Sequence, residues 1–227
     1  MYAVSNKFPT ILSSLLGVFN LSWSESAALH IDSPDRDKFF SDISNVIVKL
    51  FTSLGVGMIA CMPFLFPILV NSKYFDAYNY IPILVLGSIF NVVICLYSAI
   101  YIAKKMTKQV ATTSIIGAVI NILVNVLLIK YIGLYAASLS TCISYFVMMI
   151  YRHLDIKKYV NIKFDNGLII KSIIIYSFSI VLYYINNVYL NVLNLLVVVL
   201  YSFLINKGFL MDFKNVIVKK IKHFSYE

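Results

Sequence analysis

Charged residues are scarce in this chain: only 13% of its 227 residues are Asp, Glu, Lys or Arg, and only 10 are acidic. Soluble domains carry about 25% charged residues and about 45–50% apolar ones. This chain is 60% hydrophobic and has a mean hydropathy of +0.85. The composition excludes an ordinary soluble domain and predicts an integral membrane protein. The predicted fold is all-α, a polytopic bundle of about seven transmembrane helices.

Cysteine and histidine are also rare, with three of each. The cysteines lie apart within apolar runs and show neither metal-ligand spacing nor a disulfide framework: Cys61, Cys95 and Cys142. The histidines fall in separate loops or in the tail: His30, His153 and His223. An enzyme needs a constellation of reactive groups, and none is visible. We therefore expect no catalytic site, no metal and no cofactor.

Apolar segments at seven places are predicted to cross the bilayer, which takes about 20 residues per helix. They lie at about 7–29, 50–70, 81–103, 110–129, 134–151, 168–185 and 190–205. We divide the chain into three parts. Residues 1–153 form a transport bundle of five spans, 154–206 a basic linker with two terminal spans, and 207–227 an amphipathic cytoplasmic tail.

The first segment is polar along one side. At about 100° per residue, one stripe collects polar and small residues: Lys7, Thr10, Ser13, Ser14, Gly17, Asn20, Ser24 and Glu25. Ionisable residues inside a span are costly and suggest function. We predict that this stripe lines a substrate pathway. Helix packing through small residues is the alternative that the pattern leaves open.

The fourth and fifth spans carry candidate packing residues. Asn121 and Asn125 are four residues apart and share one helix face. Amides in a bilayer commonly bond to a neighbouring helix, worth about 0.6–2 kcal/mol each, and contact with a substrate is the second interpretation. Gly133 and Ala137 belong to a small-residue stripe that permits close helix approach.

Lysine and arginine are distributed very unevenly between the two sides of the membrane. The loops after the first, third and fifth spans, together with the tail, hold all of them except four: Lys7, Lys73, Lys130 and the boundary residue Lys49. Because positive residues favour the cytoplasmic side, the C-terminus is predicted to be cytoplasmic and the first span to begin outside. No signal peptide is visible, so we expect an N-terminal portion to be missing. The net charge of +9 then reflects topology and lipid contacts, not nucleic acid.

Several segments resemble a known family in the same order along the chain. The opening segment, YAVSNKFPTILSSLLGVFNLSWSESA, is similar to the helix that begins the C-terminal half of bacterial polysaccharide flippases. These are the O-antigen and capsular oligosaccharide translocases of the multidrug/oligosaccharidyl-lipid/polysaccharide flippase superfamily. Further similar segments are FFSDI, AYNYIPILVLGSIFN, KKMTK and GAVINILVNVLLIKYIGLYAASLSTCISY. The resemblance covers essentially the whole chain but only the latter half of a family member.

The resemblance implies two helical bundles that face each other across a cavity with alternating access. It implies an undecaprenyl-pyrophosphate-linked oligosaccharide as substrate, moved across the cytoplasmic (inner) membrane for surface polysaccharide biosynthesis. Glu25 and the Ser and Asn groups of the stripe would contact sugar hydroxyls or couple an ion, and Lys7 would meet the pyrophosphate or a sugar acid. The expected partners are this lipid-linked oligosaccharide, membrane lipids, and either the missing N-terminal half or a second copy.

Three alternatives remain open. A multidrug or cation exporter of the same superfamily would be expected to carry a buried carboxylate cluster, whereas this chain has the lone Glu25 in its first span. A truncated, inactive product would leave a polar helix face toward lipid, which is unfavourable. A membrane enzyme of glycan assembly would need reactive groups that the sequence does not bring together.

Overall fold

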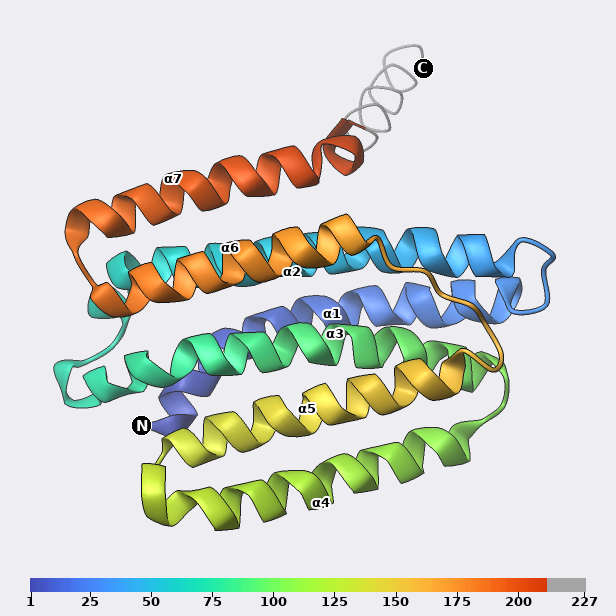
Figure 1. Ribbon diagram of the computed structural model, residues 1–227, viewed down its shortest axis with the longest axis horizontal. Coiled ribbons are helices and arrows are strands. Elements are labelled where there is room, and N and C mark those ends of the chain that lie inside the picture. The colour runs from blue at the N-terminus through green and yellow to red at the C-terminus, as the bar shows by residue number, and fades with distance from the viewer. Residues whose placement is uncertain (212–227) are drawn as a thin grey trace, which may run out of the picture.

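Long helices account for most of the chain (Figure 1). The computed structural model describes residues 1–211, and the part of the predicted tail from 212 onward lies outside the described residues. The elements are α1 (Tyr2–His30), α2 (Arg36–Leu69), the 3-10 helix η1 (Ser72–Tyr80), α3 (Ile81–Ala103), α4 (Thr107–Ile132), α5 (Tyr135–Ile156), α6 (Asn166–Ile185) and α7 (Val188–Ile205). No strand occurs among the described residues, so the predicted all-α class is confirmed.

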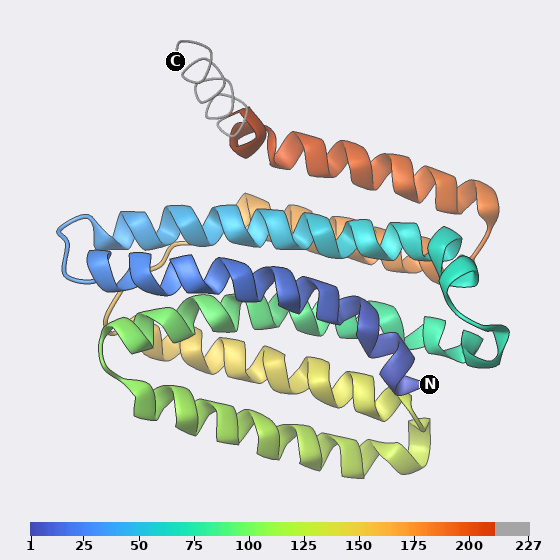
Figure 2. The same cartoon turned by 180° about the vertical axis from the view of Figure 1, so that it is seen from behind.

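Five segments are long and apolar enough to cross a membrane: α2, η1 with α3, α4, α6 and α7. The chain is therefore a membrane protein. Helices α1 and α5 are less apolar than these five, yet they run side by side with the other long helices (Figures 1 and 2). They therefore lie in the same layer, and a crossing by all seven long helices remains our prediction.

Helix α1 turns its apolar face toward α2 and α3. Trp23 is only 2% exposed and donates from Nε1 to the carbonyl oxygen of Leu96, 3.3 Å away. Its ring meets Phe40 edge-on, with centroids 5.5 Å apart, and stacks on Phe19 at 6.0 Å. Because this face is used for packing, the polar stripe of α1 is left pointing away from the core.

Pro9 lies inside α1 and changes the course of its first turns. A proline within a helix removes one backbone hydrogen bond and clashes with the preceding turn, so the helix kinks there. The turns that precede Pro9 leave the line of the rest of α1 (Figure 2). The bend directs the start of α1 across the end of α5, where the Tyr2 hydroxyl lies 3.4 Å from Thr141 Oγ1.

Helix α3 is the centre of the bundle and is buried along most of its length. It approaches the backbone of α5 closely: a Cβ on Gly87 would lie 3.4 Å from the Cα of Cys142. The predicted packing glycine, Gly133, instead ends α4 with φ of +55°, and no atom of another described helix lies within 4 Å of its Cβ position. Close helix approach therefore occurs at Gly87, and Gly133 makes the turn between α4 and α5.

The linker between α5 and α6 is hydrogen-bonded to the first turns of α2. This helix begins at Arg36, well before the predicted span at about 50. Its Ser41 Oγ accepts from the Lys163 backbone N–H (2.9 Å), and its Asn45 Oδ1 accepts from the Asp165 N–H (2.9 Å). Asp37 Oδ1 accepts from the linker in the same way, one turn earlier. These bonds fix the linker, and with it the start of α6, against α2.

Candidate functional site

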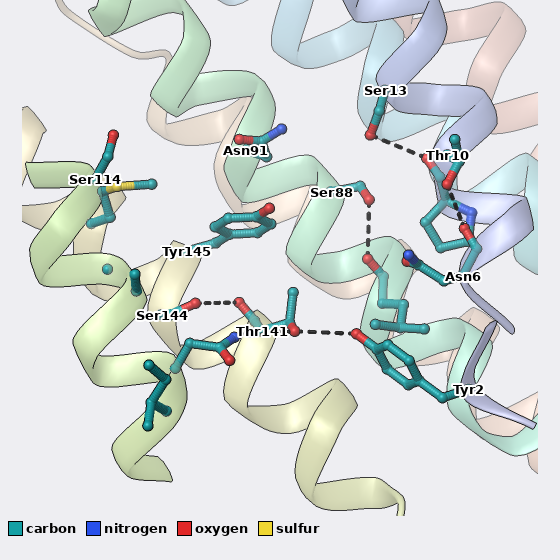
Figure 3. Close-up of a pocket in the computed structure, with 17 residues that line it drawn as sticks. Tyr2, Asn6, Thr10, Ser13, Ser88, Asn91, Ser114, Thr141, Ser144 and Tyr145 are labelled. Atoms are coloured by element: carbon teal, nitrogen blue, oxygen red, sulfur yellow. Dashed lines mark hydrogen bonds between the residues drawn. The ribbon is translucent and has the colours of Figure 1, made fainter. Parts of the chain in front are cut away.

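A polar cavity of about 640 Å³ lies between α1, α3, α4 and α5 (Figure 3). Its polar lining consists of hydroxyl and amide side chains: Tyr2, Asn6, Thr10, Ser13, Ser88, Asn91, Ser114, Asn121, Thr141, Ser144 and Tyr145. Within the described part of the chain, none of the residues that line it is Asp, Glu, Lys, Arg or His. The described lining of the cavity is therefore rich in hydroxyls and amides but uncharged.

The α1 wall of the cavity is built by regular helical spacing. Tyr2, Asn6, Thr10 and Ser13 are three or four residues apart, which places them on one face. Thr10 Oγ1 donates to the carbonyl of Asn6 (2.7 Å), and Ser13 Oγ donates to that of Pro9 (3.4 Å). Because these hydroxyl protons are used within the helix, the oxygen lone pairs remain available to a ligand.

The opposite wall is formed by α4 and α5. Asn121 Nδ2 donates to Thr141 Oγ1 at 3.3 Å, and Thr141 Oγ1 donates to the carbonyl of Ala137 at 2.9 Å. Ser144 Oγ donates to the Thr141 carbonyl at 3.0 Å, and Tyr145 on the same helix also lines the cavity (Figure 3). Asn121 thus makes the bond to a neighbouring helix that we expected and also lines the cavity.

Two amides of the lining have no hydrogen-bond partner in the described residues: the side chains of Asn6 on α1 and Asn91 on α3. Each primary amide offers two donors and one acceptor with two lone pairs. Ser88, one turn from Asn91, instead donates its hydroxyl to the Leu84 carbonyl at 3.1 Å. The free amides of Asn6 and Asn91 are therefore the groups best able to bind a polar ligand.

The predicted pathway residues are only partly brought together. Thr10 and Ser13 line the cavity. The others lie outside its lining, either exposed or half-buried along α1: Lys7, Ser14, Gly17, Asn20, Ser24 and Glu25. Ser14 and Ser24 donate to carbonyls one turn back in α1. A pathway role for this second group stays a prediction.

The predicted packing residues also differ in their surroundings. Asn121 is hydrogen-bonded to α5 as described above, and Ala137 is half-buried on α5, where its carbonyl accepts from Thr141. Asn125 is half-buried on α4, and its Oδ1 atom has no hydrogen-bond partner among residues 1–211. The packing roles of Asn125 and Ala137 stay predictions.

Sequence reasoning missed most of the lining. Tyr2 and Asn6 continue the stripe of Thr10 and Ser13 at the same spacing, but they precede the apolar segment from which that stripe was read. Ser88 and Asn91 are three residues apart within a strongly apolar span. That spacing was a usable signal for a polar face on α3.

Arg152 is the largest departure from the sequence interpretation. The sequence places it in the basic loop just after the fifth predicted span, yet its side chain is 1% exposed. It sits on α5 between α3 and α4, one turn beyond the cavity residue Met148. Its guanidinium reaches Ser114, which also lines the cavity, at 3.3 Å.

Comparison with family models, curated proteins and solved structures found no match. The ligand of the cavity must therefore be inferred from the chemistry of its walls. Those walls offer neutral donors and acceptors on four helices and aromatic faces at Tyr2 and Tyr145. They offer no charged group for an ionic ligand and no carboxylate for proton or cation coupling within the described lining.

Proposed function

We propose that the chain translocates an undecaprenyl-pyrophosphate-linked oligosaccharide across the cytoplasmic membrane by alternating access, as one bundle of a polysaccharide flippase. The observation that supports this most is the uncharged cavity lined by hydroxyls and amides. Sugar hydroxyls both donate and accept hydrogen bonds, as do the Ser, Thr, Tyr and Asn side chains around them. Aromatic rings such as Tyr145 supply flat apolar contact for the faces of sugar rings.

The proposal includes a second bundle that faces this one. Helices α3 and α5 lie between α1 and α4, which form the two sides of the cavity (Figure 3). Outside the cavity lining, α1 exposes Lys7, Ser14 and Glu25, and by our prediction this helix crosses the membrane. Polar and charged groups facing lipid are unfavourable. A facing bundle, either a further part of the transporter or a second copy, would cover them.

The ligand class can be tested by protection of a cysteine in the cavity. In a chain whose three cysteines are replaced by alanine, Ala118→Cys places a thiol in the cavity wall. A lipid-linked oligosaccharide in nanodiscs is expected to slow its labelling by maleimide several-fold, because a bound glycan excludes the reagent. A lipophilic cation is expected to leave the rate unchanged, because the lining holds no carboxylate for it.

A matched thiol provides the control. Val181→Cys lies on the exposed face of α6, outside the cavity, and its labelling should not respond to the oligosaccharide. Protection of Ala118→Cys by the cation and not by the oligosaccharide would instead favour an exporter.

A further inference from the structure

Arg152 carries a buried charge that has no acidic partner. In the described part of the chain, the ion pairs are Arg36–Asp37 and Lys158–Asp155, and neither includes Arg152. Asp155 lies one turn away on α5 but accepts from Tyr101 Oη (2.8 Å) and Lys158 Nζ (2.7 Å). The hydrogen bond to Asp155 raises the pKa of Lys158. A buried charge without an ion pair is costly and in a membrane helix points to function.

The guanidinium is held entirely by neutral groups of two other helices. On α3 it donates from Nη1 to the Ile94 carbonyl (3.1 Å) and to Ser98 Oγ. On α4 its Nε donates to Thr113 Oγ1 (2.9 Å), and its Nη2 donates to the Val110 carbonyl and to Ser114 Oγ, each at 3.3 Å. The planar fork of one arginine therefore joins three helices.

These contacts matter because α4 packs chiefly against α5 and has little contact with α3. Only Thr113 and Gly117 are buried in this helix, and both face α5 residues: Arg152 and Met148. Arg152 thus fixes one turn of α4 against α3, the turn that contains Val110, Thr113 and Ser114. Without this arginine, that part of α4 would be held to α3 mainly through the short loop that follows Ala103.

The arginine also lies directly beyond one end of the cavity on all three helices. Along α3 the cavity reaches Asn91 and the bonded residues Ile94 and Ser98 follow. Along α5 it reaches Met148, one turn before Arg152. On α4, Ser114 both lines the cavity and accepts a hydrogen bond from Arg152. Arg152 therefore fills the space between α3 and α4 at the end where α3 stops and α4 begins.

We propose that Arg152 is a positioning residue that joins α4 to α3 and thereby closes this end of the cavity. The purpose of this role rests on the proposed transport function, whereas the experiment that tests it does not. Arg152 pairs with no carboxylate among the described residues; it acts through Ser98, Thr113 and Ser114. Lysine cannot replace it, because a single ammonium nitrogen cannot bridge both helices in a planar fork.

The test is the sidedness of labelling at Ala118→Cys in the cysteine-free chain, in sealed vesicles of both orientations with a membrane-impermeant maleimide. No oligosaccharide is present, so failure here is distinct from failure of the proposed substrate. Arg152→Ala and Arg152→Lys are each expected to raise labelling from the side where α3 ends by at least about five-fold. Labelling from the opposite side should stay unchanged.

Two variants separate positioning from a general loss of structure. Arg36→Ala removes the other arginine, which pairs with Asp37 at the surface, and should leave both rates unchanged. If Arg152→Ala does not fold, Ser98→Ala combined with Thr113→Val removes one partner on each helix and keeps the arginine. The proposal is overturned if the folded Arg152 or partner variants label like the parent chain, or if labelling rises equally from both sides.

Discussion

Replacing Asn91 with leucine is expected to reduce oligosaccharide translocation by about 10- to 100-fold, because the ligand loses the hydrogen bonds of a free amide. Asn91 lines the cavity on α3, and its side-chain amide makes no hydrogen bond within the described protein. Leucine has a similar volume and is favourable in a membrane helix, so membrane insertion should be unaffected. The measurement is the rate at which lipid-linked oligosaccharide crosses vesicle membranes, normalised to the amount of protein.

Asn6→Leu, on the α1 wall of the cavity, should give a loss of similar size. Asn166→Leu is the matched control, since this amide is exposed at the start of α6 and does not line the cavity. Wild-type rates for both cavity variants, at equal abundance, would remove the cavity from the transport path.

Trp23→Ala is expected to lower the free energy of unfolding by about 3–5 kcal/mol, the range for removing a fully buried large aromatic side chain. The indole packs against Phe19 and Phe40 and bonds to the Leu96 carbonyl, so it joins α1 to α2 and α3. Denaturant titration in detergent micelles, followed by tyrosine fluorescence, provides the measurement.

Trp23→Phe should cost much less, about 1 kcal/mol, because it keeps a buried ring and loses one hydrogen bond. Phe178→Ala, on the partly exposed side of α6, should have little effect. If Trp23→Ala changes stability no more than Phe178→Ala does, α1 is not anchored through this residue.

The apolar runs were sufficient to predict the helices. The third span was expected at about 81–103 and α3 is Ile81–Ala103. In a bilayer, a helix satisfies its own backbone, so its position depends mainly on local composition. The periodicity of α1 also located Thr10 and Ser13 on the cavity side, since residues that share a helix face are fixed by spacing alone.

The rest of the cavity depends on which helices become neighbours, and composition does not specify this. Asn91 lies in an apolar span, and only the packing of α3 between α1 and α5 brings it to the cavity. Arg152 is one of several basic residues near the end of α5, and its burial follows from the hydroxyls and carbonyls of α3 and α4. Similarly, the sequence of α7 is almost entirely apolar, yet its Asn191 and Asn194 are buried against the rest of the protein.

The most direct test of the central idea, that the cavity receives the glycan, is photocrosslinking inside cells that make a lipid-linked oligosaccharide. p-Benzoylphenylalanine would replace Tyr145 in the cavity and, as a control, Phe178 on the exposed side of α6. The proposed function predicts sugar-bearing adducts at position 145 and lipid adducts without sugar at position 178. Adducts at position 145 that contain no sugar, in cells where the oligosaccharide is abundant, would contradict it.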